Sequence, residues 1–485
     1  MLNKYDIIIV GAGPSGIFTA YELIQLGIVP GKKVLLIDQG KPVENRYCPI
    51  AKTGKCLKCK PYCNITSGFS GSGAFSDGKI TLPHPDAETI EVGGDIEQYL
   101  GIDYAKKIIK YTDGIYLAFG ADKKVEGTKF EKERKAIVDK AKKNNLTVVN
   151  SLIRHLGTEK SHKLFEKIEK FLIDNGVEMA FETNVTDLIV NNGTISGVVV
   201  QDSYCRTPVR RIYSNIVVVG IGRKGAQWLS NMCKKHEIKS RAGAIDIGVR
   251  YELPDKYMTE VNKYFYELKA IGKLPPSGDK VRTFCQNPSG FVASEGYDGG
   301  VMCVNGHSFK NKKSTNTNLA LLVSHFFGPM EDPIRFGMNV AQNINLIGNG
   351  NPIVQRLGDI VDPIHEKRTW DYELAENSVV PTLKTAVPGD ITFVLPHRTM
   401  NDILSFIKAM DKVVPGFAHP DNLLYAAEVK FYSNSVLIDN CFETSIKGLY
   451  SIGDGGGLTR GLIMASASGV QMARILKNNV FWTQK

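Results

Sequence analysis

The sequence predicts an α/β protein whose main sheet is parallel and is assembled from segments far apart in the chain. The chain opens with a β-branched run within Asp6–Val10, followed directly by glycines and an apolar-faced helix that ends near Gly27. It closes in the same order, with a strand over Leu449–Ile452, a glycine cluster and a helix from Gly461 to Lys477. Continuous apolar strands that lead into helices are typical of parallel sheets covered on both faces.

Composition narrows the class of protein. The 485 residues are 43% hydrophobic, which excludes a disordered chain, and the length predicts about three domain-sized units. With 60 basic and 50 acidic residues the net charge is +10, and the lysines are scattered, as on a solvated surface. A nucleic-acid partner is therefore not expected, whereas an anionic substrate or cofactor would suit the charge.

Targeting signals are not evident. The first strand begins too early for a cleavable secretory segment, and the apolar stretch Ile7–Val29 is interrupted by Pro14 and Glu22. Nine cysteines without an export signal point to reduced thiols. We expect a cytoplasmic protein with no membrane partner.

The first chemical motif is the glycine-rich turn Gly11–Gly16. Gly11 allows a tight turn, Gly13 lets the backbone approach a pyrophosphate, and Gly16 allows close packing of helix and strand. Pro14 and Ser15 complete the turn, and the start of the helix offers N–H groups to an anion. A second strand, Val34–Ile37, ends on Asp38, where a carboxylate accepts hydrogen bonds from a ribose and repels a 2′-phosphate. This is the pattern of a Rossmann-like domain for FAD or NAD.

The middle of the chain is less regular. Residues 39–80 are expected to form a loop, and residues 95–175 to be mostly helical. Val185–Val190 and Ile195–Val200, joined by Asn-Gly, predict a β-hairpin, and residues 216–219 predict another buried strand. Residues 241–445 indicate a mixed α/β segment with helices near 333–347 and 400–410.

The carboxyl-terminal motif resembles the second FAD motif of glutathione-reductase-like flavoproteins. It contains Gly453 and Asp454 after the last strand, then Gly461 and Leu462 at the start of a helix. The resemblance implies that Asp454 holds a ribityl hydroxyl and that the helix points its amino terminus at the flavin. It also implies that backbone near Val185 lies against the adenine.

The turn Gly220–Gly225 is a further Gly-x-Gly-x-x-Gly after a strand. In one interpretation it begins a separate NAD(P)H domain, in which Arg223 and Lys224 bind a 2′-phosphate. In the other, the strand before it returns to the FAD domain and ends at Gly220 and Gly222. A dinucleotide-binding domain has an acidic residue at the end of its second strand, and no clear strand of this kind follows the turn at the expected spacing. The second interpretation is therefore favoured. NAD(P)H would then act only as a transient reductant.

Over nearly its whole length the chain is similar to a poorly characterised group of bacterial FAD-dependent dehydrogenases. The resemblance implies an FAD oxidoreductase and supplies no substrate. The loop that carries redox cysteines in disulfide reductases here reads Gly71–Ser76 without cysteine, so thiol–disulfide chemistry is not expected there. In this region Gly73 is taken as a cofactor contact, and Lys79 either meets the cofactor or is exposed. The matching segments are Gly73–Lys79, Gly222–Leu229, Asp246–Arg250, Thr283–Cys285, Gln355–Asp359, Glu428–Ser433, Gly453–Gly455 and Thr459–Leu462.

These motifs predict three parts of the chain. Residues 1–80, 177–235 and 446–485 form a discontinuous FAD-binding domain, and residues 81–176 form a helical insertion. Residues 236–445 form an inserted α+β substrate or cap domain.

A cysteine cluster precedes the glycine loop. Cys48, Cys56, Cys59 and Cys63 have the spacing C-x7-C-x2-C-x3-C, interleaved with lysines. Thiolates at such spacing ligate zinc or an iron–sulfur cluster. The spacing matches no common ferredoxin motif, so the choice between zinc and an iron–sulfur cluster stays open. The alternatives to a metal site are a Cys56/Cys59 redox pair and unligated thiols.

The expected activity is transfer of hydride or electrons between FAD and a small organic substrate. Arg356 and Arg460 are candidate anchors for a carboxylate substrate, and His307 is a further catalytic candidate. The alternatives are a flavin-dependent RNA-modifying enzyme and an FAD redox sensor or electron carrier that uses the cysteines. The oligomeric state is left open.

Overall fold

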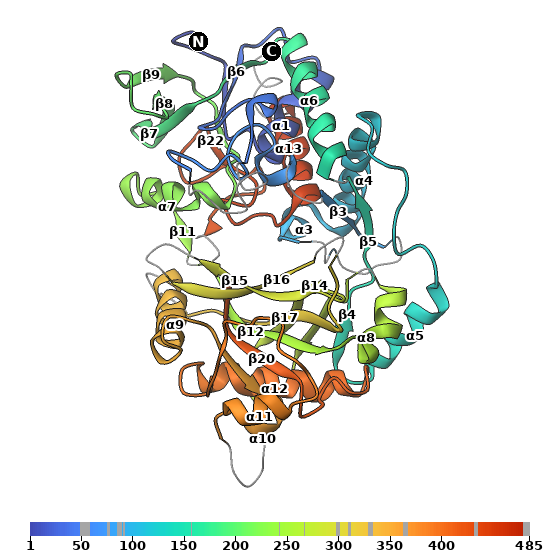
Figure 1. The fold of residues 1–485 in the computed structure, drawn as a ribbon. Helices are drawn as coiled ribbons and strands as arrows, with labels where there is room; N and C mark the ends of the chain where they lie inside the picture. Colours follow the sequence, from blue (N-terminus) through green and yellow to red (C-terminus); the bar gives the residue numbers. More distant parts are fainter. Residues whose placement is uncertain are drawn as a thin grey trace. The chain divides into compact units, whose positions relative to one another are not determined.

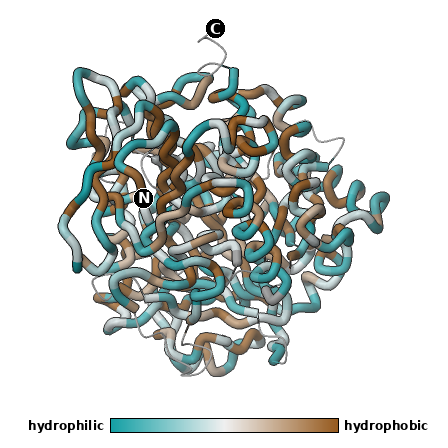
Figure 2. Tube along the Cα trace, turned by 90° about the horizontal axis from the view of Figure 1, so that it is seen from above, coloured by the Kyte–Doolittle hydropathy of each residue, from teal (hydrophilic) through white to brown (hydrophobic). Residues whose placement is uncertain are grey.

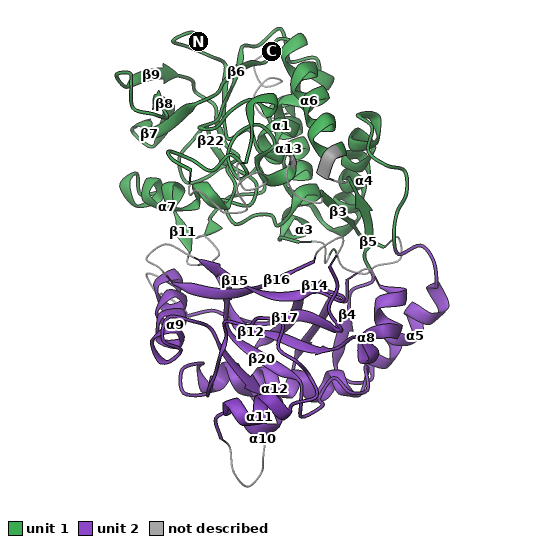
Figure 3. Cartoon of the chain, in the orientation of Figure 1, with its two compact units in different colours: residues 1–126, 151–241, 433–485 green, residues 127–150, 242–432 purple. Residues whose placement is uncertain are grey.

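The computed structural model describes residues 1–48, 59–74, 78–84, 90, 93–156, 158–241, 243–265, 267–296, 301–308, 312–327, 333–361, 367–430 and 435–478. The chain divides into two compact units (Figure 3). Unit 1 contains residues 1–126, 151–241 and 433–485, and unit 2 contains residues 127–150 and 242–432. Unit 2 thus takes a short segment from within the stretch 81–176.

Unit 1 is built on a five-stranded parallel sheet (Figure 1). Its strand order brings the last strand of the chain beside strands from the middle and the start. The strands, in spatial order, are β22 (Leu449–Ser451), β10 (Val217–Val219), β1 (Ile7–Val10), β2 (Val34–Ile37) and β6 (Glu178–Ala180). This confirms the predicted fold class, with a parallel sheet discontinuous in sequence.

Alternation along β1 explains why both faces of this sheet are covered. Ile7 and Ile9 belong to one apolar cluster, and Ile8 and Val10 belong to another. The first cluster includes residues of α1 (Pro14–Gln25), α4 (Ile102–Ala118), α6 (Thr158–Asp174) and α13 (Leu462–Leu476). The second includes residues of β7 (Thr183–Asn191), β8 (Thr194–Asp202) and α7 (Ala226–Lys235). Figure 2 shows brown, apolar segments nearer the interior and many teal turns at the periphery.

The predicted hairpin is confirmed as β7 and β8, which are antiparallel, with β9 (Arg210–Tyr213) beside them. Asn192 and Gly193 both have positive φ, +48° and +72°, as a two-residue hairpin turn requires. The structure differs from the expectation for residues 39–80 and 95–175. There β3 (Lys79–Leu82) pairs with β5 (Leu152–His155), because the pairing of short strands distant in sequence leaves no local periodicity.

The remaining elements of unit 1 are short. They are η1 (Val43–Asn45), η2 (Gly71–Ala74), α3 (Ile96–Leu100), η3 (Arg223–Gly225), β11 (Ser240–Arg241) and β21 (Ser435–Val436).

Unit 2 is built on an eight-stranded, mostly antiparallel sheet. In order, its strands are β19 (Val387–Pro388), β18 (Ile353–Arg356), β20 (Leu423–Lys430), β12 (Ile245–Pro254), β17 (Asn316–His325), β14 (Lys280–Asn287), β13 (Ala270–Lys273) and β4 (Leu146–Val148). The hairpin of β15 (Phe291–Gly296) and β16 (Met302–His307) forms a separate small sheet. The helices are α5 (Glu131–Lys142), α8 (Asp255–Tyr264), α9 (Pro333–Ile347), α10 (Leu357–Val361), α11 (Asp371–Glu376) and α12 (His397–Asp411).

The two helices predicted in this part of the chain are confirmed as α9 and α12. None of the helices in the described ranges combines the length and the apolar character that a bilayer crossing requires.

Candidate functional site

The first glycine turn connects β1 to α1, and two of its glycines are required by close backbone contacts. Gly11 has φ +103°, and a Cβ there would lie 2.8 Å from the carbonyl oxygen of Gly220. A Cβ at Gly16 would lie 2.0 Å from the carbonyl oxygen of Gly11. Gly13 differs, because the nearest atom to a Cβ there is 4.0 Å away. The turn therefore leaves open space beside Gly13.

The amino terminus of α1 is suited to an anion. Gly13 is the N-cap residue, it makes no side-chain capping hydrogen bond, and Pro14 occupies the first turn. The first-turn N–H groups of a helix have no intrahelical partner, and the helix dipole places partial positive charge there. No acidic side chain lies in this turn to neutralise that charge. The geometry fits a phosphate group.

Asp38, at the end of β2, ties three backbone segments together. Its carboxylate accepts hydrogen bonds from the N–H groups of Ala12 (2.9 Å), Gly40 (2.8 Å) and Gly68 (2.8 Å). A carboxylate has about four lone-pair sites, so these three bonds leave capacity for one more donor, such as a ribose hydroxyl. The sequence predicted the ribose contact but not this backbone role.

The carboxyl-terminal turn lies against the first one. Gly453 has φ +77°, and a Cβ there would lie 2.7 Å from the Oγ of Ser15. Further along, α13 packs against α1 so closely that a Cβ at Gly469 would lie 2.1 Å from the carbonyl oxygen of Ser15. The structure thus brings together the two ends of the chain, as the sequence motifs required.

Asp454 organises the start of α13. Its carboxylate accepts hydrogen bonds from the Thr459 hydroxyl (2.7 Å) and the Gly461 N–H (3.2 Å). Burial raises the pKa of Asp454, although these two donors and the charge of Arg460 oppose the shift. Gly461 has φ +89°, and a Cβ there would meet no atom within 4 Å, so the helix start that continues into Leu462 faces open space.

The third glycine turn belongs to the same sheet. Gly220 follows β10, which pairs with β1 on one side and β22 on the other. Its carbonyl oxygen accepts a hydrogen bond from the Ser15 hydroxyl (2.9 Å). A Cβ at Gly222 would meet no atom within 4 Å. This turn therefore contributes a wall to the space beside Gly13 and does not begin a separate sheet.

Arg46 is a structural residue of this site that sequence analysis missed. It is 4% exposed, and its guanidinium donates to the carbonyl oxygens of Asn64, Ile65, Phe69 and Gly71 and to the Ser70 hydroxyl. Burial lowers its pKa to about 10, opposed by the carboxylate of Asp38, so it remains charged at neutral pH. The loop folds around this one side chain, and no local sequence pattern signals that.

The Arg46 loop reaches the glycine turns. The Ser70 N–H donates to the carbonyl oxygen of Ala12 (2.7 Å), and a Cβ at Gly71 would lie 3.7 Å from the Cα of Gly13. Gly73 packs against side chains of Phe165 and Leu462. Gly73 is therefore placed beside the start of α13.

The other predicted cofactor contacts lie on strands. Lys79 begins β3, where it pairs opposite His155 of β5. Val185 is 5% exposed and lies in β7 opposite Val200. Neither residue makes a described contact with the glycine turns.

The cysteine cluster is described only in part, because Cys56 lies outside the described residues. Cys48 and Cys63 are half-buried, and Cys59 is exposed. Their chain neighbours are in contact, because the Asn64 side-chain amide donates a hydrogen bond to the carbonyl oxygen of Tyr47 (3.0 Å). Burial opposes ionisation of the Cys63 thiol, but N–H groups of Ile65 and Thr66 and the charge of Lys224 lower its pKa overall.

Among the described residues, no group of three or more His, Cys, Asp or Glu side chains has the arrangement of a metal site. The metal set of Cys48, Cys56, Cys59 and Cys63 therefore stays a prediction.

The catalytic candidates lie on elements of both units. Arg460 belongs to unit 1, where its guanidinium donates to the carbonyl oxygen of Thr459 (2.9 Å). Arg356 ends β18 in unit 2, with Asp421 at 3.2 Å and Asp359 at 3.7 Å. His307 is exposed and ends β16 opposite Phe291. Within unit 2, none of the described hydrogen bonds or ion pairs joins Arg356 to His307.

Unit 2 carries a polar sheet face that sequence analysis did not assign. Alternate residues of β12 point away from the apolar core, which places Asp246 and Arg250 on this face. Arg250 and Glu428 are fully buried and 3.5 Å apart, and Lys430 is 3.1 Å from Glu428. Arg282 pairs with Asp246 at 2.6 Å. The strict alternation in Ile245–Pro254 was the available sequence signal.

The fold and the three turns define unit 1 as a Rossmann-like dinucleotide-binding domain. Its residues fit FAD. A Cβ at Gly13, Gly222 or Gly461 would meet no side chain within 4 Å. The starts of α1 and α13 have no side-chain cap, and the carboxyl group of Asp454 lies beside the start of α13.

Comparison with known proteins agrees with the coarse class. Residues 245–431 match a family model described as "FAD-dependent protein, C-terminal domain-like". An uncharacterized protein of Clostridium beijerinckii is 25% identical over 503 residues, covering 96% of this chain and 79% of that protein. The family match falls in unit 2, whereas the glycine turns lie in unit 1. The match supports the FAD-dependent class, and the narrower superfamily stays a prediction.

Three solved structures align with nearly the whole chain at low similarity. L-proline dehydrogenase from P. horikoshii has a TM-score of 0.42 and 12% identity, covering 99% of this chain and 94% of that one. An E. coli quinol fumarate reductase FrdA variant has a TM-score of 0.39 and 14% identity, and the alignment covers 98% of this chain and 70% of that one. L-amino acid deaminase from Proteus vulgaris has a TM-score of 0.37 and 13% identity, and the alignment covers 98% of this chain and 94% of that one.

Proposed function

We propose that this chain is an FAD-dependent oxidoreductase that acts on a small organic molecule. The observation that carries the proposal is the convergence of three glycine turns, from β1, β10 and β22, on one space beside two uncapped helix starts. When bound, FAD supplies the hydride or electron transfer itself.

The chain's own residues bind and orient. The N–H groups at the start of α1 hold the diphosphate, and the Asp38 carboxylate accepts a ribose hydroxyl while fixing Ala12 and Gly68. Asp454 accepts a ribityl hydroxyl and keeps the start of α13 in place through Thr459. Arg460 in unit 1 and Arg356 in unit 2 are separate candidates for binding a substrate carboxylate.

The test exploits the difference between neighbouring glycines. Gly13→Val adds a side chain to open space, so the protein should fold but lose most of its flavin. Gly114→Ala, in α4 where a Cβ meets nothing within 4 Å, is the matched control and should retain flavin. Visible absorbance per protein chain and circular dichroism are measured on both. A Gly13→Val variant that keeps full flavin content would overturn the proposed site.

The electron donor requires a separate experiment. Anaerobic mixing of the flavin-loaded protein with NADH or NADPH should bleach the flavin if a nicotinamide is the transient reductant. Small carboxylates, in their reduced and oxidised forms, are then screened as substrates. A substrate is recognised by the change in flavin absorbance that it causes.

The two alternatives remain distinguishable. A salt-sensitive association with RNA would favour the RNA-modifying enzyme. Zinc or iron in anaerobically purified protein, lost in a Cys56→Ser/Cys59→Ser variant, would favour a cysteine-bound metal and the electron-carrier interpretation.

A further inference from the structure

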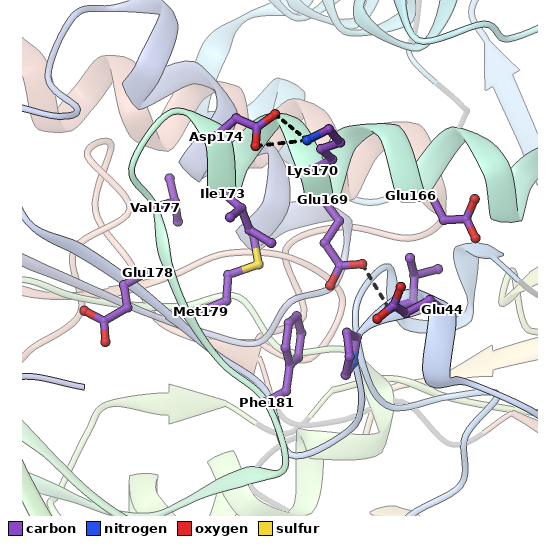
Figure 4. A pocket seen from close by; sticks show the side chains of 12 residues that line it. Glu44, Glu166, Glu169, Lys170, Ile173, Asp174, Val177, Glu178, Met179 and Phe181 are labelled. Carbon is purple, nitrogen blue, oxygen red and sulfur yellow. Dashed lines mark hydrogen bonds and ion pairs between the residues drawn. The ribbon is translucent and has the colours of Figure 1, made fainter.

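A cavity of about 940 Å³ lies along the edge strand of the unit 1 sheet. It is bounded by β6 and the residues around it, by α6, and by η1 with the proline before it (Figure 4). No described residue of the three glycine turns is among those that line it. The cavity is therefore a separate place in unit 1, and its size is typical of small-molecule sites.

The cavity is acidic although the protein as a whole carries +10. One lysine, Lys170, faces five carboxylates, and it is paired with Asp174 at 3.0 Å. The carboxylates are Glu44, Glu166, Glu169, Asp174 and Glu178.

Two more of these carboxylates have partners among the described residues. Glu178 pairs with the amino-terminal ammonium of Met1 (2.8 Å), and Glu166 lies 3.2 Å from His162. Within the described part of the chain, no cation forms an ion pair with Glu44 or Glu169.

Glu169 is the side chain that points to a ligand. It is 6% exposed, and one carboxylate oxygen accepts the N–H of Val43 (3.0 Å). The other oxygen is buried and has no hydrogen-bond donor among the described residues. In Figure 4 the carboxylate lies between Glu44 and Phe181, toward the interior of the cavity. A buried acceptor that lacks a donor is destabilising, and a donor supplied by a ligand removes that cost.

The environment of Glu169 keeps its proton in the absence of a cation. Burial raises its pKa to about 7, and Glu44 and Glu166 add to the shift, whereas the Val43 N–H and Arg46 oppose it. A cation placed beside the carboxylate would reverse this balance and release the proton.

Part of the cavity wall is apolar. Ile173 is 53% exposed in spite of its size, and Val177, Met179 and Phe181 continue the surface along β6. A molecule that fills the cavity therefore needs a cationic end for the carboxylates and an apolar body for this wall.

We propose that this cavity binds a small organic amine, with its ammonium at Glu169 and Glu44 and its apolar stem against Ile173 and Met179. The site is independent of the flavin chemistry proposed above. A lysine side chain from a protein partner has the same end group, but a cavity of about 940 Å³ is far larger than one lysine side chain and has the size typical of sites for free small molecules.

The experiment uses isothermal titration calorimetry of the full chain at pH 6 with n-hexylamine. We expect one site per chain and the release of up to about one proton per bound amine, read from titrations in two buffers of different ionisation enthalpy. The neutral isostere 1-hexanol should bind at least tenfold more weakly.

Variants separate the site from general charge attraction. Glu169→Gln should weaken n-hexylamine at least tenfold and abolish proton release, and Glu44→Gln, at an exposed position, should weaken it severalfold. Glu133→Gln, which removes one exposed carboxylate from α5, should change nothing. No detectable binding, equal affinity for 1-hexanol, or equal affinity in the Glu44→Gln and Glu133→Gln variants would each overturn the proposal. If the Glu169→Gln variant does not fold, the comparison of Glu44→Gln with Glu133→Gln still tests the proposal.

Discussion

The hydroxyl of Ser15 donates a hydrogen bond to the carbonyl oxygen of Gly220, a residue 205 positions later in the chain. Ser15 also contacts the second FAD-like turn, because its Oγ would lie 2.7 Å from a Cβ at Gly453. One small side chain thus meets both of the other glycine turns. The cofactor site proposed for unit 1 depends on this close approach of backbone from three parts of the sequence.

The contact between α1 and α13 should be intolerant of any side chain. Gly469→Ala places a Cβ 2.1 Å from the carbonyl oxygen of Ser15, so we expect a loss of about 3 kcal/mol or more in the free energy of unfolding. Gly114→Ala should instead gain about 0.5–1 kcal/mol, because it improves helix propensity in open space. Urea unfolding measures both, and a Gly469→Ala protein as stable as the parent would contradict the packing described.

Arg46 should be irreplaceable by lysine. One ammonium cannot serve the five acceptors that the guanidinium satisfies, so Arg46→Lys should cost about 2–4 kcal/mol and expose residues 64–71 to proteolysis. Arg206→Lys is the control, because Arg206 is 64% exposed and its contacts with Asp202 and the Tyr204 ring lie on the surface. Equal protease resistance in the two variants would refute this role.

Stability should depend on the pH through Glu169. Its pKa is 4.5 in the unfolded chain and about 7 in the folded protein, so between these values the folded state holds more protons. Stability therefore falls as the pH rises from 4.5 to 7, by about 2–3 kcal/mol for this group.

Glu169→Gln keeps the acceptor for the Val43 N–H and has no proton to lose. Its unfolding free energy should be flatter over the same pH range, as denaturant titrations at several pH values would show. A slope identical to that of the parent protein would argue against a protonated Glu169.

The cysteines should differ in reactivity. The lowered pKa of Cys63 favours the thiolate, whereas burial raises the pKa of Cys303 to about 12 and that of Cys233 to about 11. In chelator-treated native protein at pH 7.5, iodoacetamide should label Cys63 well before the other two, as peptide mass spectrometry can follow. Denatured protein should label all three at similar rates. Simultaneous labelling in the native state would be inconsistent with these environments.

The sequence predicted the glycine turns, the hairpin and the helices α9, α12 and α13 because each has a local signal. Periodicity, turn residues and chain order are short-range properties of the sequence. The strands β3 and β5 and the Arg46 loop have no such signal. Their hydrogen bonds join residues that carry no pattern of their own.

By itself the sequence determined which residues take up strand, turn and helix near the two ends, since backbone sterics and apolar periodicity act over a few residues. Only the tertiary structure decided that Asp38 binds three backbone amides, that Arg46 sits inside its loop, and that Glu169 is buried with one orphaned oxygen. Burial and partner identity depend on which distant segments pack together, and that choice is made by the whole chain.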